Sequence, residues 1–404
     1  MANVTQLKHL EHLEDEMLNY GVEGCIAAVN FLKELRKMLG CDNSTGYMQT
    51  KWDGAPSIVC GKDPANGHFF VGTKSVFNKD RPKICYGPDQ IDEWYSNKQN
   101  LAEGLKLSLE YFSKLGINGV VQGDLLFTAA TRKTETIHGE KVYTFTPNTI
   151  TYAIPIDHPI GKAVGTAKVG VVFHTHYTGE KDGWDISSMS ARAGAKVKSN
   201  KDVVCIDNDT PMHKVGLNHN EENKFDQYIS NIETMCKASG DFLDELVKFS
   251  GTTGDLKWHV SSYVKQFFNA EIRAARTIGN VDTVFESLYN FYYDKTAKML
   301  ADIKTKDTKK KKRALVQYSQ NYLRDNQDKF KGMLGLYREL QAVKQMVIDK
   351  LDHLETFRTF VETEKGYKVT GPEGYVLHRN GDMIKFVNRL EFSYNNFTLA
   401  KKWR

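Results

Sequence analysis

From Tyr47 onward, the chain of 404 residues changes its hydrophobic periodicity twice, and this order of patterns restricts the fold more than any other feature. From Tyr47 to about Phe173, short β-rich runs are separated by glycine turns. From Glu221 to about Thr363, apolar residues recur at helical spacing. The stretch from Tyr367 to Phe392 returns to short β-rich runs. A long helical segment is therefore predicted to interrupt a β-rich core, whose last strands come from the C-terminal residues.

These patterns predict an α+β fold with an antiparallel β-rich core, N-terminal helices and a large all-helical insertion. Helical spacing from about Thr5 to Leu39 predicts the N-terminal helices, which Gly21 and Gly24 are expected to break into two. One more helix is expected near residues 99–115, within the core. The predicted units are 1–45 (N-terminal helices), 46–220 (first part of the core), 221–365 (helical insertion) and 366–404 (final strands of the core).

Composition is that of an ordinary water-soluble protein, with 40% hydrophobic and 26% charged residues. No apolar run approaches the roughly 20 residues that span a bilayer, and the first residues lack the apolar core of a signal peptide. A cytoplasmic protein with no membrane partner is therefore expected. The six cysteines are scattered without a C-x-x-C pair, which suggests neither a zinc site nor a disulfide framework. A net charge of +5 permits nucleic-acid binding without requiring it.

The strongest chemical signal is Lys51-Trp52-Asp53-Gly54. The flanking residues predict two strands, so Lys51 ends a strand while Asp53 and Gly54 occupy a turn. A lysine amine that has lost its proton can attack the α-phosphorus of a nucleotide and carry AMP as a phosphoramidate. Asp53 can orient the amine, and Gly54 lets backbone groups approach closely. Taken alone, the pattern also fits an ordinary hairpin with a surface lysine.

Further polar positions follow in order, each on or beside a predicted strand. They are Lys74-Ser75, Asp124 in the run Gly123-Asp124-Leu125, Tyr152 in the run 150–155, Glu373-Gly374, and Lys385 in the run 383–387.

This series resembles the motifs of the covalent nucleotidyltransferases, the superfamily of ATP-dependent DNA ligases, RNA ligases and mRNA capping enzymes. The resemblance covers residues 47–173 and 367–392. It implies an antiparallel nucleotidyltransferase core that uses ATP and Mg²⁺. The catalytic residues that it implies are Lys51 and Asp53, the nucleotide-binding residues are Thr50, Gly54, Lys74, Asp124, Tyr152, Glu373 and Lys385, and the Mg²⁺ ligands are Asp124 and Glu373. In that family an aromatic residue at the position of Tyr152 stacks on the nucleotide base.

The chain departs from the family pattern at two positions. Asp124 stands where the family commonly has a glutamate, and Val387 replaces the second lysine of the last motif. Strand alternation predicts that Val387 shares a face with Lys385, so one phosphate contact is missing there. Arg389 is the candidate to replace it.

The branch of the superfamily is suggested by the residues after Lys385. DNA ligases and capping enzymes carry an OB domain after this motif, and residues 386–404 are too few for one. The chain therefore most resembles a phage RNA ligase, acting in the host cytoplasm on nucleic acid with 5′-phosphate and 3′-hydroxyl ends, with RNA favoured over DNA. Two alternatives stay open: an adenylyltransferase with a protein or other non-nucleic-acid acceptor, and a non-catalytic binding or scaffold protein that reuses the fold.

Three other patterns allow two interpretations each. The lysine-rich run 304–313 fits either an electrostatic patch for a nucleic-acid backbone or a solvated helix junction. His174 and His176 share one face of a predicted strand and could bind metal, although such histidines more often pack or form hydrogen bonds. Arg132 and Lys133 fit either a phosphate contact or a solvated loop.

Overall fold

The computed structural model describes residues 11–40, 44–179, 186, 190–193, 195–248, 260–354, 358–363, 366–380 and 382–393. The helices are α1 (Glu16–Leu39), α2 (Pro88–Tyr95), α3 (Gln99–Phe112), α4 (Pro159–Thr166), α5 (His219–Lys248), α6 (Val260–Arg273), α7 (Val281–Asp302), α8 (Lys306–Asp325) and α9 (Gln327–Leu351). The strands are β1 (Tyr47–Lys51), β2 (Ser57–Lys62), β3 (Phe69–Gly72), β4 (Val120–Thr128), β5 (Lys133–Ile137), β6 (Glu140–Phe145), β7 (Ile150–Pro155), β8 (Val169–Thr178), β9 (Ser190–Ala193), β10 (Val203–Cys205), β11 (Arg358–Thr363), β12 (Gly366–Val369), β13 (Gly374–Arg379) and β14 (Asp382–Phe386).

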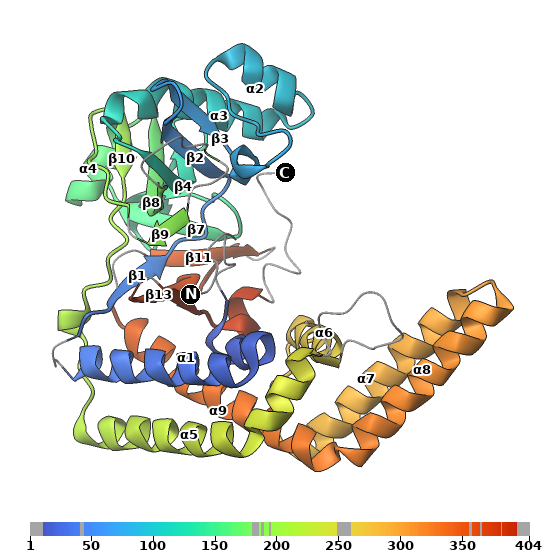
Figure 1. Ribbon diagram of the computed structural model, residues 1–404. Coiled ribbons are helices and arrows are strands. Elements are labelled where there is room, and N and C mark those ends of the chain that lie inside the picture. The colour runs from blue at the N-terminus through green and yellow to red at the C-terminus, as the bar shows by residue number, and fades with distance from the viewer. Residues whose placement is uncertain are drawn as a thin grey trace.

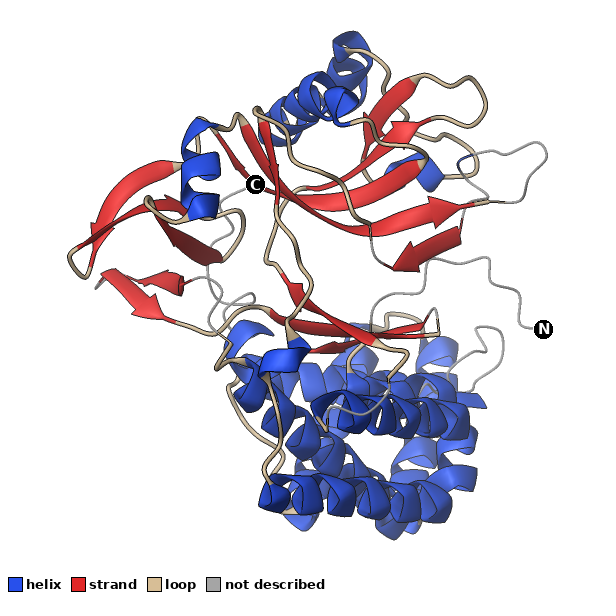
Figure 2. Cartoon of the chain, turned by 90° about the vertical axis from the view of Figure 1, so that its left-hand side faces the viewer, coloured by secondary structure: helices blue, strands red, loops and turns tan. Residues whose placement is uncertain are grey.

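The strands form three sheets, in which every described pairing is antiparallel except that of β8 with β10. The strand orders are β1-β13-β14, β10-β8-β4-β2-β3 with β9 on β8, and β12-β11-β7-β6-β5. The prediction of an α+β fold with antiparallel sheets is confirmed. Because β1 pairs with β13, residues from opposite ends of the chain complete one small sheet, which lies between the larger sheets and the helices (Figure 2).

The small sheet β1-β13-β14 has one apolar and one mostly polar face. Met48 and Leu377 pair across β1 and β13, and both pack into the core formed with the helices. Gln49, Val376 and Lys385 form the neighbouring row, so strand alternation turns them to the opposite face. Lys385 is therefore directed toward the side of the sheet that faces the other strands (Figure 2).

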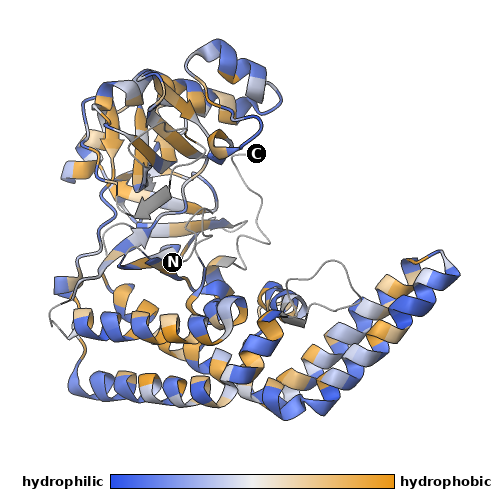
Figure 3. Ribbon diagram, viewed as in Figure 1, coloured by the Kyte–Doolittle hydropathy of each residue, from blue (hydrophilic) through white to orange (hydrophobic). Residues whose placement is uncertain are grey.

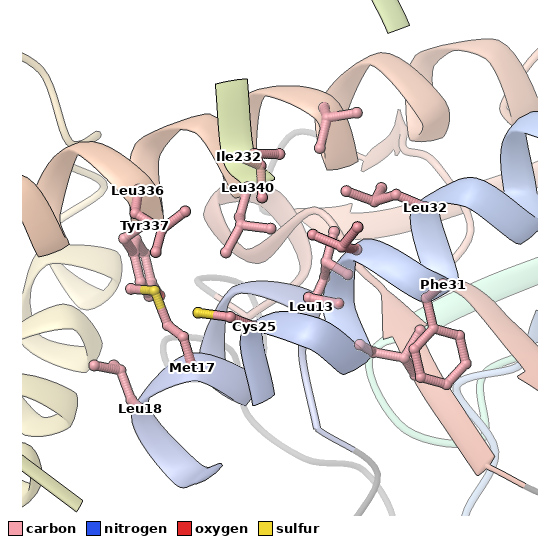
Figure 4. Close-up of a cluster of buried hydrophobic side chains, with 14 of the residues drawn as sticks. Leu13, Met17, Leu18, Cys25, Phe31, Leu32, Ile232, Leu336, Tyr337 and Leu340 are labelled. Carbon is pink, nitrogen blue, oxygen red and sulfur yellow. The ribbon is translucent and has the colours of Figure 1, made fainter. Parts of the chain in front are cut away.

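Helices α1 and α9 cover the apolar face of the small sheet, and α5 packs on these two helices on the side away from the sheet (Figure 1). Figure 3 shows that the upper sheets are rich in hydrophobic residues, whereas the lower edge formed by α5 is largely hydrophilic. Figure 4 shows the buried contacts that join these helices, among them Leu13, Met17, Cys25, Leu32, Ile232, Leu336, Tyr337 and Leu340. Helices α7 and α8 project from this body as a two-helix arm (Figure 1).

A buried ion pair ties the first described residues to the helical body. The Lys344 ammonium lies 2.5 Å from the Glu14 carboxylate, and both side chains are almost fully buried. Breaking a pair of this kind by removing one partner usually costs about 3–5 kcal/mol, because the other charge is left buried and unpaired. The pair therefore fixes the N-terminal segment beside the small sheet.

Two predicted boundaries are wrong. The helical segment ends at Leu351, and Arg358–Thr363, which the prediction placed in the insertion, forms strand β11 between β7 and β12. Three adjacent residues there, Thr359, Phe360 and Val361, are β-branched or aromatic, and pairing with β7 selects the extended form. The predicted break between two N-terminal helices is present at Gly21, where the backbone is non-helical, but the predicted break at Gly24 is wrong because α1 continues through it.

The predicted break at Gly21 is a kink within α1. Gly21 has a φ of +59°, and a Cβ added there would lie 2.1 Å from Asp244 Oδ1. The same oxygen accepts a hydrogen bond of 2.9 Å from the Val22 N–H. The part of the helix prediction that covers residues 1–10 lies outside the described residues.

The remaining helix predictions are confirmed in outline. Helix α3, followed by a 3₁₀ turn to Leu115, occupies the predicted range 99–115. The lysine-rich run lies mostly in the first turns of α8. Within the described residues, no helix combines the length and the apolar character needed to span a bilayer.

Candidate active site

The loop that follows Lys51, between β1 and β2, forms hydrogen bonds with β4 of the second sheet. Ala55 N donates a hydrogen bond of 2.9 Å to Leu125 O, and Leu125 N donates one of 3.1 Å to Pro56 O. These bonds press Gly54 against β4, where a Cβ added to Gly54 would lie 2.5 Å from Asp124 Cβ. The close backbone approach expected at Gly54 is therefore present, and the segment that approaches it is β4.

Replacing Gly54 with alanine is expected to displace the loop from β4. The added methyl cannot fit 2.5 Å from Asp124 Cβ, so we expect a loss of about 1–3 kcal/mol in the free energy of unfolding. Urea unfolding would measure it. Gly216→Ala is the matched control, because no atom lies within 4 Å of a Cβ placed there. Equal stability of the two variants would contradict the tight packing.

Asp53 anchors the same loop to the start of β7. Its Oδ1 accepts a hydrogen bond of 2.7 Å from Asn148 Nδ2, and its Oδ2 accepts bonds of 2.7 and 2.8 Å from the N–H groups of Thr149 and Ile150. The Asp53 N–H donates to the Tyr152 hydroxyl at 2.7 Å. With three donors on its carboxylate, Asp53 holds the loop that presents Lys51, which is a positioning role.

Asn148 also belongs to this anchor, although the sequence motifs did not predict it. The only local signal is the turn-forming pair Pro147-Asn148 directly before a predicted strand, and such pairs are common in loops. Its partner, Asp53, lies far away in the sequence, so the contact is set by the tertiary fold.

Lys51 forms an ion pair with Glu373 across the small sheet. The register sets Lys51 opposite Gly374, and Lys51 Nζ lies 2.5 Å from Glu373 Oε1. Gly374 has a φ of +147°, and a Cβ there would lie 2.3 Å from Phe386 O. The Glu-Gly sequence therefore puts a carboxylate beside the lysine at a point where β14 leaves no room for a second side chain.

The pair is shielded, and this shielding shifts both pKa values. Burial, with a smaller contribution from Asp53 and Asp124, raises the pKa of Glu373 to about 7, although Lys51 opposes the shift. Burial alone would lower the pKa of Lys51, but the Glu373 carboxylate outweighs it and the net pKa is raised. At neutral pH the proton therefore resides on Lys51, and the resting amine is not nucleophilic.

Asp124 brings a second carboxylate to the site from the facing sheet. Its Oδ2 lies 3.5 Å from His174 Nε2. Burial would raise the pKa of Asp124, but His174 and Lys51 outweigh it and hold that pKa below its usual value. Asp124 is therefore ionised at neutral pH, and its charge acts on Lys51 although the two residues come from different sheets.

Lys385 supplies a second cation on the face that carries Gln49 and Val376. Burial and the neighbouring Lys51 charge lower the pKa of Lys385. Its main-chain N–H donates to Glu11 O at 3.0 Å, so the N-terminal segment runs along β14. The charge of Lys51 acts on Lys385, so both lysines belong to one cationic region that suits a phosphate.

His12 enters the site on this segment and had no signal in the sequence. Its side chain is 9% exposed, and its Nδ1 is buried without a hydrogen-bond partner within the described residues. Burial, followed by the charges of nearby cations that include Lys385 and Lys51, keeps the pKa of His12 well below its ordinary value. The ring is therefore neutral at pH 7.

Thr50 and Tyr152 lie close to the lysine, but both have structural partners. Thr50 Oγ1 lies 3.1 Å from Thr210 Oγ1. The Tyr152 ring is 2% exposed and packs on Trp52, with ring centroids 4.6 Å apart. Phe145 stacks on it as well, with centroids 5.6 Å apart. The ring therefore offers little free surface for the base stacking that the resemblance implies.

Three other residues bring no charged group to Lys51, although Val387 packs beside Gly374 near the lysine. Lys74 follows β3 in a 3₁₀ turn and is exposed, with no ion pair to another described residue. Val387 follows β14 and is 2% exposed in an apolar cluster. Arg389 donates hydrogen bonds to the Tyr337 hydroxyl at 2.9 Å and to Asp15, so its guanidinium is held in the helical body and does not replace the missing lysine.

A cavity of about 470 Å³ lies next to Lys51, between β1, β7, β11 and the loop before β13. Its lining includes Thr50, Lys51, Tyr152, Thr359, Thr370 and Tyr375. This volume falls in the range of about 300–1,000 Å³ typical of small-molecule sites. The cavity is large enough for part of a nucleotide beside the lysine.

The arrangement also fits a magnesium site of the kind that uses substrate phosphates. Within the described residues, no group of three or more His, Cys, Asp or Glu side chains is placed to hold a metal ion, so the histidine-pair metal hypothesis gains no support. Mg²⁺ is commonly held by one or two carboxylates, with phosphates and water completing its shell. Glu373 contacts Lys51, and Asp124 influences it electrostatically, so these two carboxylates are the candidates for that role.

The fold and this site define a mixed α+β protein in which a lysine lines a cavity and forms an ion pair with a largely buried glutamate. The chain belongs to a family of unknown function, DUF6267, whose model matches residues 3–401. Comparisons with curated proteins and with solved structures give no significant match.

Proposed function

We propose that this chain is an ATP-dependent nucleotidyltransferase that carries AMP on Lys51 and passes it to the 5′-phosphate end of a polynucleotide, with RNA as the first candidate acceptor. The observation that carries the proposal is the ion pair of Lys51 and Glu373, together with the electrostatic influence of Asp124 and Lys385 on this pair. Their chain order is that of the covalent nucleotidyltransferase motifs, and the residue types match except that Asp124 replaces a glutamate. Their convergence supports a shared chemistry.

The first step forms a bond between Lys51 Nζ and the α-phosphorus of ATP. The bond from that phosphorus to the bridging oxygen of the β-phosphate breaks, and pyrophosphate leaves. Nζ must lose a proton, and the carboxylate of Glu373, 2.5 Å away with a pKa of about 7, can accept it. Lys385 stabilises the negative charge on the phosphate oxygens.

The second step moves AMP to the acceptor. An oxygen of the 5′-phosphate attacks the α-phosphorus, the N–P bond breaks, and the proton returns to Lys51. A 3′-hydroxyl then attacks the 5′-phosphate, loses its proton and displaces AMP, so a phosphodiester bond joins the two ends. Of the two implied Mg²⁺ ligands, Asp124 would hold the ion while Glu373 takes the lysine proton, and when bound this ion offsets negative charge on the phosphates.

The test is transfer of label from α-³²P-ATP to the protein in Mg²⁺, read on a denaturing gel. We expect a labelled band that is labile in acid and stable in alkali, and that loses its label to pyrophosphate. Adding RNA with a 5′-phosphate should move the label to the RNA, whereas RNA with a 5′-hydroxyl should not. Absence of label from ATP, GTP and NAD would contradict the proposal. Transfer of the labelled AMP to proteins but not to RNA would instead indicate an acceptor that is not a nucleic acid.

A further inference from the structure

Helices α7 and α8 form an antiparallel hairpin that projects away from the sheets (Figure 1). Tyr292 and Ser319 form a hydrogen bond across the hairpin. Nearer its base, Arg324 lies 3.7 Å from the centroid of the Tyr289 ring and 2.7 Å from Glu286. These contacts fix the register of the two helices, so the positions of other side chains along the arm follow from it.

The outer end of this arm concentrates positive charge. Residues 294–313 contain nine lysine and arginine residues and three aspartates, a net charge of +6. The whole chain has a net charge of +5, so everything outside this segment is slightly negative. Within the described residues, none of the nine cations forms an ion pair. Like charges gathered without counter-charges repel one another, which favours a polyanionic partner.

Exposed aromatic rings accompany the charge. Tyr293 on α7 is 53% exposed and Tyr318 on α8 is 59% exposed. The contact between Tyr292 and Ser319 puts both rings at one level of the hairpin. Lys311 and Tyr318 are seven residues apart and therefore share a face of α8. Cations that track phosphates beside rings that stack on bases are the usual elements of single-strand binding.

The apolar residues of α8 argue against a lipid surface as the partner. A helix that lies on a membrane needs a free apolar face. Val316 and Leu323 are buried in α8, and the exposed positions at its start carry Lys306, Lys310 and Arg313. The arm therefore presents charge and tyrosine rings to solvent, and its aliphatic side is used inside the hairpin.

We infer that the outer end of the arm, residues 294–313 with Tyr293 and Tyr318, binds the sugar–phosphate backbone of a polynucleotide. This inference rests on the proposed function, because it names the element that would hold the nucleic acid whose end reacts at Lys51. The part of α8 from Lys306 to Tyr318 is about 20 Å long. At about 3.4 Å per nucleotide of a helical strand, this outer end spans about six nucleotides.

The test replaces the five residues 309–313 with glutamine, which keeps helix propensity and removes five charges. Binding of a 30-nucleotide, fluorescently labelled RNA would be measured by anisotropy between 50 and 200 mM salt. We expect at least a ten-fold loss of affinity at 100 mM salt. The dependence of log K on log salt should also become smaller, by about 0.7 for each phosphate that the variant no longer neutralises. Label transfer from ATP to Lys51 should stay unchanged, because the arm is not part of that pocket.

The matched control replaces five exposed lysines of the β-rich part with glutamine, and so makes the same change in net charge. These are Lys62, Lys79, Lys98, Lys141 and Lys162. An arm variant no weaker than this control, with an unchanged salt slope, would overturn the inference. The inference would also be overturned if the arm variant kept its RNA affinity but no longer bound vesicles of anionic lipid. The arm would then be a membrane-binding surface. If the wild type binds RNA through the arm yet takes no label from ATP, the inference about the arm is supported and the proposed function is contradicted.

Discussion

Replacing Lys51 with alanine should abolish label transfer from ATP, with a fall of at least about 10⁴-fold, because the only group proposed to form the N–P bond is removed. Lys51→Arg should be equally inactive, since a guanidinium keeps its proton at any working pH. The measurement is the radioactive band on a denaturing gel. Lys62→Ala is a control for loss of a lysine, because Lys62 is exposed at the end of β2.

The Lys51→Ala variant is also expected to fold. Without the ammonium, the pKa of Glu373, already raised to about 7 by burial, should rise further. The carboxyl group then becomes neutral at pH 7, so no unpaired buried charge remains. Circular dichroism and a thermal melt would establish this. A folded Lys51→Ala protein that still takes up label would move the covalent site to another residue and contradict the assignment of the nucleophile.

The central part of this site was predictable because it depends on local sequence. Lys51, Asp53 and Gly54 lie in one turn between two strands, and the residue types of such a turn can be recognised without a structure. Glu373 was recognisable for the same reason, since a Glu-Gly pair precedes a clear strand. What joins them is the pairing of β1 with β13, which follows from one β-rich run at each end of a helical segment.

The rest of the site depends on tertiary contacts that leave little trace in sequence. Asn148 reaches Asp53 only because β7 lies beside the loop, and His12 bridges to β14 from residues that helical spacing had placed in a helix. Tyr152 fits a strand pattern equally well as a core ring or as a stacking surface, and its packing on Trp52 depends on the fold. Strand β11 was missed because it has only six residues and directly follows a long helical run, so its alternation of apolar and polar residues is too short to recognise.

Replacing Glu373 with glutamine should lower the maximal rate of label transfer by at least about 100-fold, the usual scale for loss of a general base. The variant keeps the shape of the side chain but accepts no proton from Lys51, 2.5 Å away in the wild type. The rate would be measured as labelled protein against time, from pH 5.5 to 9. Glu110→Gln on α3 is the control, because that carboxylate is on the surface.

The pH profile separates a role in proton transfer from a role in packing. The pKa of Glu373 is raised to about 7, so below that pH the carboxyl group is protonated and cannot accept the lysine proton. The wild-type rate should therefore rise as the pH increases through about 7, and this inflection should be absent in Glu373→Gln. A glutamine variant that is slower but keeps the inflection would assign the titration to another group.

The same raised pKa predicts an opposite trend in stability. Because folding raises the pKa of Glu373 from an ordinary value of 4.5 to about 7, the folded state binds the proton more tightly than the unfolded state between these values. The stabilisation from this proton is complete below about pH 4.5 and is lost as the pH rises to about 7. Glu373→Gln lacks this loss, so its stability relative to the wild type should increase across that window. Urea unfolding at pH 5 and pH 8 would measure the difference, and a constant difference would mean that the pKa of Glu373 is not raised. Activity that rises while stability falls over one pH range would indicate that the fold maintains a strained carboxylate for use at Lys51.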